Sequence, residues 1–224
     1  LMHIPDGFID IPTSAAFAAA SSVAVAGAVK GARKQLSEQS APLAGLTAVF
    51  IFAVQMLNFP VAAGTSGHLI GAALAMVLVG PYAATLALVV VLIIQAFLFA
   101  DGGLTALGLS IFNMAVISVW VSFIVFMILK KILPKTKSWL VVATFISALI
   151  SVPAAAIGFV IQYAIGANAT FSVGAVLNAM VGSHILIGIG EAIITALTVS
   201  AVLASRSDLV FGWDSKNSPL EIRS

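Results

Sequence analysis

The chain has 224 residues, of which 61% are hydrophobic and only 8% are charged, with a formal net charge of +2. A soluble domain of this length could not carry so much apolar surface, so the composition predicts a polytopic membrane protein. The small net charge gives no indication of nucleic-acid binding, and the absence of cysteine excludes disulfides and thiolate metal sites.

The first feature along the chain is a histidine close to the N-terminus. The chain begins Leu1-Met2-His3, and this start lacks the basic n-region of a cleavable signal peptide. A terminal amine, ionised backbone amides and an imidazole Nδ1 can form fused chelate rings around one ion, with the donors nearly in a plane. Such coordination suits Ni(II) and Cu(II) better than Zn(II), Mg(II) or Ca(II). We therefore expect a metal-chelating segment over residues 1–12, although a histidine here could also arise by chance.

Seven hydrophobic segments follow, each long enough to cross or nearly cross a bilayer. They lie at residues 13–32, 42–58, 67–80, 82–99, 105–131, 138–165 and 178–204. Their apolar runs are continuous and do not alternate with period two, which favours helices over a β-barrel. The third segment is short. The predicted fold class is an all-α polytopic membrane protein with about seven transmembrane helices.

Basic residues predict the orientation of these helices. They follow the first, fifth and seventh segments, at Lys30, Arg33, Lys34, Lys130, Lys131, Lys135, Lys137 and Arg206. With seven spans all of them fall on one side, which the positive-inside rule makes the cytoplasm. We therefore expect an outer N-terminus, a transmembrane substrate-binding domain over 1–205 and a cytoplasmic tail over 206–224. The protein would be a multi-pass component of a prokaryotic cell membrane.

His68 stands at the predicted outer start of the third segment. Thr65 and Ser66 just before it could cap this helix, and the histidine could be an ordinary interfacial side chain. It shares the outer face with His3, however, where three nitrogens of the terminal segment would leave one planar position open. The candidate metal-binding residues are therefore Met2, His3 and His68, with Leu1 included if its amine is free.

His184 and Glu191 lie on roughly the same face of the last segment, with Glu191 about 10 Å deeper. An ionisable group so far into a span is expensive and is usually functional or paired, although a structural carboxylate is an equal alternative. We expect both residues to support the metal ligands rather than to bind the ion directly. A second hypothesis is a membrane enzyme or secondary carrier for a small polar substrate, with His184 and Glu191 as its polar pair.

A stripe of alanines recurs every four residues in the first segment, at Ala16, Ala20, Ala24 and Ala28. Small residues at this spacing let another helix approach closely in lipid, although an alanine-rich helix also produces such runs by chance. We interpret the stripe as a candidate docking face for a partner subunit. The chain has no Walker A sequence, so ATP-driven transport would need separate ATPase subunits.

Several motifs, in order along the chain, carry a resemblance to a known family. They are Met2-His3-Ile4-Pro5-Asp6-Gly7-Phe8, Gln55-Met56-Leu57-Asn58-Phe59-Pro60, Gly64-Thr65-Ser66-Gly67-His68-Leu69, Phe99-Ala100-Asp101-Gly102-Gly103-Leu104-Thr105-Ala106-Leu107-Gly108 and Gly188-Ile189-Gly190-Glu191-Ala192. The chain resembles the CbiM/NikM family, the substrate-binding S components of energy-coupling-factor (ECF) nickel and cobalt transporters. The resemblance runs from Met2 to about Ser205.

The resemblance implies a seven-helix S component that imports Ni(II) or Co(II), with no enzymatic activity and no catalytic cofactor. Its partners would be a transmembrane coupling subunit and two cytoplasmic ATPases, with a small accessory membrane subunit as an optional addition. The implied ligands are the Met2 amine, the His3 amide and imidazole, and the His68 imidazole. Leu1 departs from the family pattern, because members begin at the methionine. Planar nitrogen donation makes nickel the favoured ion and cobalt the alternative.

Overall fold

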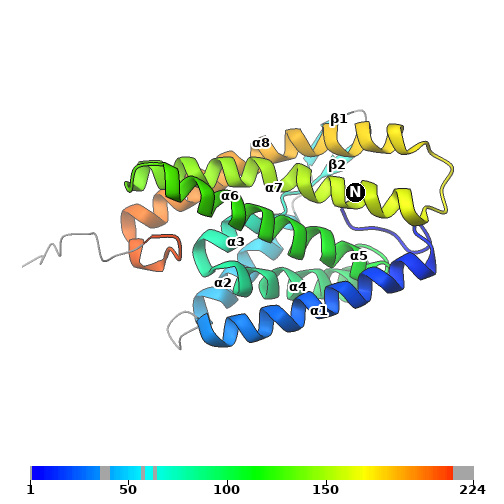
Figure 1. Cartoon of the computed structure of the whole chain (residues 1–224), viewed down its shortest axis with the longest axis horizontal. Coiled ribbons are helices and arrows are strands. Elements are labelled where there is room, and N and C mark those ends of the chain that lie inside the picture. Colours follow the sequence, from blue (N-terminus) through cyan, green and yellow to red (C-terminus); the bar gives the residue numbers. More distant parts are fainter. Residues whose placement is uncertain (1, 36–40, 57–58, 63–64, 214–224) are drawn as a thin grey trace, which may run out of the picture.

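The computed structural model describes residues 2–35, 41–56, 59–62 and 65–213. Within this part of the chain the long helices run side by side along one elongated bundle (Figure 1). The elements are α1 (Ile11–Gln35), α2 (Ala41–Gln55), β1 (Phe59–Ala62), β2 (Thr65–Gly67), α3 (Ala72–Val79), α4 (Pro81–Phe99), α5 (Leu107–Ile111), η1 (Phe112–Ile117), α6 (Ser118–Ile132), α7 (Lys137–Gly166), α8 (Val173–Ser205) and η2 (Ser207–Leu209). The strands β1 and β2 form one short antiparallel pair.

The prediction of a helical membrane protein is confirmed. Five helices are long and apolar enough to cross a membrane, namely α1, α4, α7, α8 and the continuous helix formed by α5, η1 and α6. The apolar helix α2 is shorter, at 15 residues. Helix α3 has 8 residues, and at about 1.5 Å per residue it is too short to cross a hydrocarbon core of about 30 Å alone. The number of complete crossings and the orientation of the termini stay predictions.

Helix α3 is the centre of the bundle. Seven of its eight residues are buried, as expected for a helix that is apolar on every face. It begins at Ala72 rather than near residue 67, so the predicted third span is partly wrong. Residues 68–70, which the apolar pattern includes in this span, lie outside any helix or strand. Thr65 and Ser66 belong to β2, so they precede α3 by several residues and are not its N-cap, which is Gly71.

The C-terminal end of α3 is closed by the segment after α8. The amide of Phe211 donates to the Leu78 carbonyl at 3.2 Å, and the amide of Gly212 donates to the Val77 carbonyl at 3.3 Å. The last carbonyls of a helix have no partner within the helix, so residues 207–213 supply two of the missing donors. The first part of the predicted cytoplasmic tail is therefore packed against the bundle.

A buried amide pair fixes the α5–η1–α6 helix against α7. Asn113 Nδ2 donates to Gln162 Oε1 at 2.8 Å, and Gln162 Nε2 donates back to Asn113 Oδ1 at 3.0 Å. Asn113 lies in the π-helical turn η1, a wider turn that often occurs near functional sites. The pair holds α5 in place, and α5 carries one of the contacts to the N-terminal segment described next.

Candidate metal site

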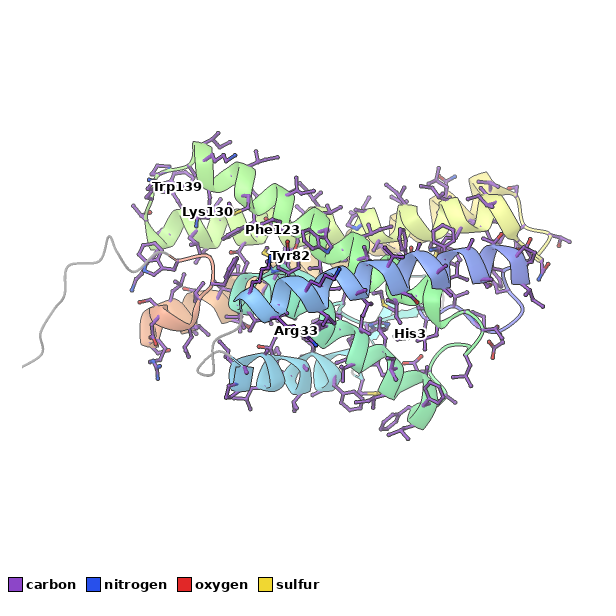
Figure 2. All side chains as sticks on the ribbon, turned by 60° about the horizontal axis from the view of Figure 1, so that its bottom comes forward. His3, Arg33, Tyr82, Phe123, Lys130 and Trp139 are labelled. Atoms are coloured by element: carbon purple, nitrogen blue, oxygen red, sulfur yellow. The ribbon has the colours of Figure 1, made fainter. Side chains whose placement is uncertain are left out.

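The N-terminal segment places His3 beside His68. The two imidazole rings lie with their centroids 4.8 Å apart and their planes inclined by 44°. His3 is 8% exposed and His68 is half-buried. Figure 2 shows His3 away from the end of the bundle that carries Lys130 and Trp139. The structure thus brings together two of the predicted ligands that are far apart in the sequence.

Each ring leaves a nitrogen available. His68 Nδ1 lies 2.9 Å from the Leu69 carbonyl, so a proton on Nδ1 satisfies that carbonyl and leaves Nε2 as an electron-pair donor. His3 Nε2 is buried without a hydrogen-bond partner among the described residues and lies 3.8 Å from Asp101 Oδ2. A carboxylate beside one imidazole nitrogen orients a histidine whose other nitrogen binds a metal. Asp101 lies in the motif over residues 99–108, but nothing in the sequence indicates that it lies beside His3.

Both imidazoles are neutral at physiological pH. Burial lowers the pKa of His3 to about 4, and the neighbouring His68 lowers it further, while Asp101 acts in the opposite direction. Burial also lowers the pKa of His68. Metal coordination requires a deprotonated imidazole nitrogen. The site therefore holds its two histidines in the form that can bind a metal.

The backbone of the N-terminal segment is held on both sides by residues that follow α4. The amide of Ile4 donates to Ser110 Oγ at 3.2 Å, and the Ile4 carbonyl accepts from the amide of Gly103 at 2.8 Å. Asp6 Oδ1 accepts from the Thr105 amide at 2.8 Å and from the Thr105 hydroxyl. These contacts fix the residues directly after His3, so backbone hydrogen bonds help to hold its imidazole in position.

The turn after α4 presses closely against His3, and the turn after α7 holds the rest of the segment. Gly102 has a φ of +94°, and a Cβ there would lie 3.2 Å from the Cβ of His3. Asn168 Nδ2 donates to the Gly7 carbonyl at 2.9 Å, and its amide donates to the Phe8 carbonyl at 3.1 Å. Residues 2–10 thus form a strap that contacts two loops before α1 begins.

Glu191 holds the other side of the site. Its carboxylate is 1% exposed and accepts hydrogen bonds from the amides of Ile70 at 2.7 Å and Gly71 at 3.1 Å. Gln55 Nε2 donates to the Ile70 carbonyl at 2.7 Å. The backbone two residues after His68 is therefore bound from α2 and from α8. The structure places Glu191 against this backbone and not among the imidazoles.

His184 is the most deeply buried of the three histidines, at 2% exposure. Its Nδ1 lies 2.7 Å from the Met180 carbonyl of its own helix. No hydrogen bond joins His184 to Glu191 in the described part of the chain, so the polar pair of the second hypothesis is not formed there. Among the described residues no group of three or more His, Cys, Asp or Glu side chains could hold a metal. Backbone nitrogens would have to complete a site around His3 and His68.

The alanine stripe of α1 turns from the surface into the bundle. Ala16 and Ala20 are exposed, Ala24 is half-buried, and Ala28 is 2% exposed. The reason is geometric: steps of four residues exceed the helical turn of 3.6, so the stripe rotates by roughly 40° per step. The predicted docking face is therefore wrong at Ala28, which packs inside this chain.

Comparison with known proteins identifies the family. Residues 3–209 match the family model for a cobalt uptake substrate-specific transmembrane region. The chain belongs to the CbiM family. Membership confirms the predicted resemblance, and it confirms a multi-pass transport protein rather than an enzyme.

Several relatives and a solved structure match most of the chain. A candidate metal transport protein of Haloquadratum walsbyi is 39% identical over 212 residues, which are 94% of each chain. A candidate fused nickel transport protein of Archaeoglobus fulgidus is 38% identical over 93% of this chain and 68% of its own length. The crystal structure of a truncated transition metal transporter matches 90% of this chain and 98% of its own, with a TM-score of 0.81 and 32% identity.

Proposed function

We propose that this chain captures Ni(II), with Co(II) as the alternative cargo, as the substrate-binding S component of an ECF-type importer. The observation that supports this most directly is the contact between the His3 and His68 rings, 4.8 Å apart, in a member of a metal-uptake family. Relatives carry the names of nickel and of cobalt transport proteins. The preference for nickel rests on the planar nitrogen donors that a histidine near an amine can supply.

The proposed ligands are nitrogens of the strap and of His68. His3 would contribute its deprotonated amide and its imidazole Nδ1, while its Nε2–H faces Asp101, and His68 would contribute Nε2. The remaining nitrogen depends on the first residue of the mature chain. A chain that starts at Met2 offers the Met2 amine. Leu1 lies outside the described residues; with Leu1 ahead, Met2 offers an amide and Leu1 the amine.

The surrounding residues would keep these donors in position. Burial holds both imidazoles neutral, so little proton release from the rings accompanies binding. Ser110 and Gly103 fix the strap after His3, and Glu191 fixes the backbone after His68. The two halves of the site come from separate segments, with most of the proposed donors on the strap and one on His68.

Transport would require partners that this chain does not contain. We infer a transmembrane coupling subunit and two cytoplasmic ATPases, together with an optional small accessory membrane subunit. The part of the alanine stripe that is exposed, Ala16 and Ala20 with the half-buried Ala24, is the proposed docking face for the coupling subunit. Helix α1 is suited to this because little of its apolar surface is buried within the chain.

The test is metal analysis of the purified protein together with the visible spectrum of the bound ion. We expect one nickel per chain with the spectrum of a planar nitrogen site, loss of binding in His3→Ala, and severe weakening in His68→Ala. His184→Gln serves as the matched control, because that histidine is satisfied within its own helix. Full nickel affinity in the His3→Ala protein would overturn the proposal. Loss of binding only in His184→Gln would favour the second hypothesis.

A further inference from the structure

A small pocket lies between the α6–α7 turn and the segment that follows α8. Its volume is about 80 Å³. Two lysines and two tryptophans line it, together with apolar side chains: Lys130, Lys135, Trp139, Trp213, Leu133 and Leu140. Figure 2 shows Lys130 and Trp139 at the end of the bundle away from His3. The pocket is therefore separate from the candidate metal site.

The lining of the pocket is mostly apolar but includes several hydrogen-bond donors. Lys130 Nζ uses one donor on the Gly212 carbonyl at 2.7 Å, and an ammonium has three. Lys135 is exposed. Trp213 Nε1 is buried and has no partner among the described residues. A buried donor without a partner is costly, and here it belongs to a residue of the pocket wall.

No carboxylate lines the pocket in the described part of the chain. Asp208, at the start of the same segment, is bound by Arg206 at 2.8 Å. Among the described residues, the pocket therefore combines two positive charges and an indole donor without a partner, and no carboxylate lines it. An anion with several acceptor oxygens, such as a phosphate group, fits this chemistry.

Position and apolar surroundings favour a lipid as the source of such a phosphate group. The described basic residues at the ends of α1, α6 and α8 and at the start of α7 lie at this end of the bundle (Figure 1), which the positive-inside rule assigns to the cytoplasmic face. Trp139 is 41% exposed and Ile132, at the end of α6, is 70% exposed, as in the interfacial belt of a membrane protein. Basic pockets between helices on this face suit anionic lipid headgroups.

We propose that this pocket binds the phosphate of an anionic phospholipid of the cytoplasmic leaflet. The lipid would bridge the α6–α7 turn and the segment 207–213. Because the amides of Phe211 and Gly212 bind the last carbonyls of α3, a bound lipid holds the C-terminal end of that helix closed. Bound lipid is therefore expected to raise the thermal stability of the protein.

The experiment uses the full chain in neutral detergent, with phosphatidylglycerol as the anionic probe and phosphatidylcholine as the zwitterionic one. Native mass spectrometry measures retained lipid, and the melting temperature is measured against lipid concentration. The variants are Lys135→Gln and the double variant Lys135→Gln/Trp213→Phe, which keeps an aromatic ring and removes its donor. The matched control is Lys131→Gln, an exposed lysine at the same helix end that does not line the pocket.

We expect one retained phosphatidylglycerol and a higher melting temperature for the unaltered chain and for Lys131→Gln. In Lys135→Gln, both effects should require about tenfold more lipid, which corresponds to roughly 1.4 kcal/mol. The double variant should require still more lipid. Equal effects in all four proteins, or an equal effect of phosphatidylcholine, would overturn the proposal. An equal shift with inorganic phosphate alone would also overturn it, because the ligand would then be a soluble phosphate and not a lipid.

Discussion

Glu191 accepts a hydrogen bond of 2.7 Å from the backbone amide of Ile70, although 121 residues separate the two. The same carboxylate accepts from the amide of Gly71 at 3.1 Å. Water is scarce in the interior of a membrane bundle, so backbone groups outside a helix need partners from the protein. One side chain of α8 thus allows the chain to pass non-helically from His68 to the start of α3.

Removal of this carboxylate should weaken metal binding. Glu191→Ala leaves two buried amides without acceptors, at a cost of about 1–3 kcal/mol each, and frees the backbone after His68. We expect nickel affinity to fall by roughly 10- to 100-fold, the usual effect of losing a group that orients a ligand. Isothermal titration well below the melting temperature measures it. Glu191→Gln keeps one acceptor and should lose less; unchanged affinity in a folded Glu191→Ala protein would show that this anchor does not position His68.

The stability of the metal-free protein should fall in acid because of His3. Its pKa is lowered from 6.5 to about 4, so between these values the unfolded chain binds a proton that the folded chain does not. Stability therefore decreases as the pH falls through this window and is unaffected above it. The loss is at most about 3–4 kcal/mol. Melting temperatures from about pH 7 to about pH 4 measure it, and His3→Gln should show a shallower decline; an equal decline in both proteins would contradict the assignment.

The strap should tolerate no side chain at Gly103. A Cβ at this position would overlap the backbone nitrogen of Asp6, so Gly103→Ala must displace the residues that follow His3. We expect weaker nickel binding with the helices intact, measured by titration and circular dichroism. Gly182→Ala is the matched control: it lies in α8 with nothing within 4 Å of a new Cβ, so it should leave nickel binding unchanged. Equal affinities in the two variants would argue against a tightly held strap.

Substitutions in the exposed part of the alanine stripe should impair assembly without affecting metal binding. Ala20→Leu/Ala24→Leu should impair complex formation or uptake while nickel binding stays normal. Ala28→Leu should instead destabilise the chain itself, by about 1–3 kcal/mol, because this alanine is buried. Ala26→Leu, on another exposed face of α1, is the control. Undiminished ATP-dependent uptake by the double variant would remove this face from consideration.

The first residue of the mature chain should decide how much the site depends on His68. From Met2, the strap offers an amine, an amide and an imidazole, which leaves one planar position for His68. From a free Leu1, it offers an amine, two amides and an imidazole, or it is strained by an extra residue of about 3.5 Å. We expect lower metal occupancy or transport with Leu1, and a smaller effect of His68→Ala. If both forms bind equally and depend equally on His68, Leu1 is a passive addition.

Composition and local pattern were enough to predict the class of this protein. Continuous apolar runs predicted the long helices, because a chain in lipid must satisfy its backbone hydrogen bonds within each segment. The chelating potential of His3 is likewise local, since its donors are neighbours along the chain. The family resemblance also rests on motifs that lie in order along the chain, and this resemblance implies cobalt as the alternative ion.

Only the tertiary structure decided which distant groups meet. It set His3 beside His68 and Asp101, bound Glu191 to the backbone of Ile70, and turned Ala28 into the bundle. It also began α3 at Ala72, later than the apolar pattern predicts. The reason is that hydropathy indicates how strongly a residue favours burial, but not which partner it packs against. Hydrogen bonds across more than a hundred residues exist only once the helices have packed.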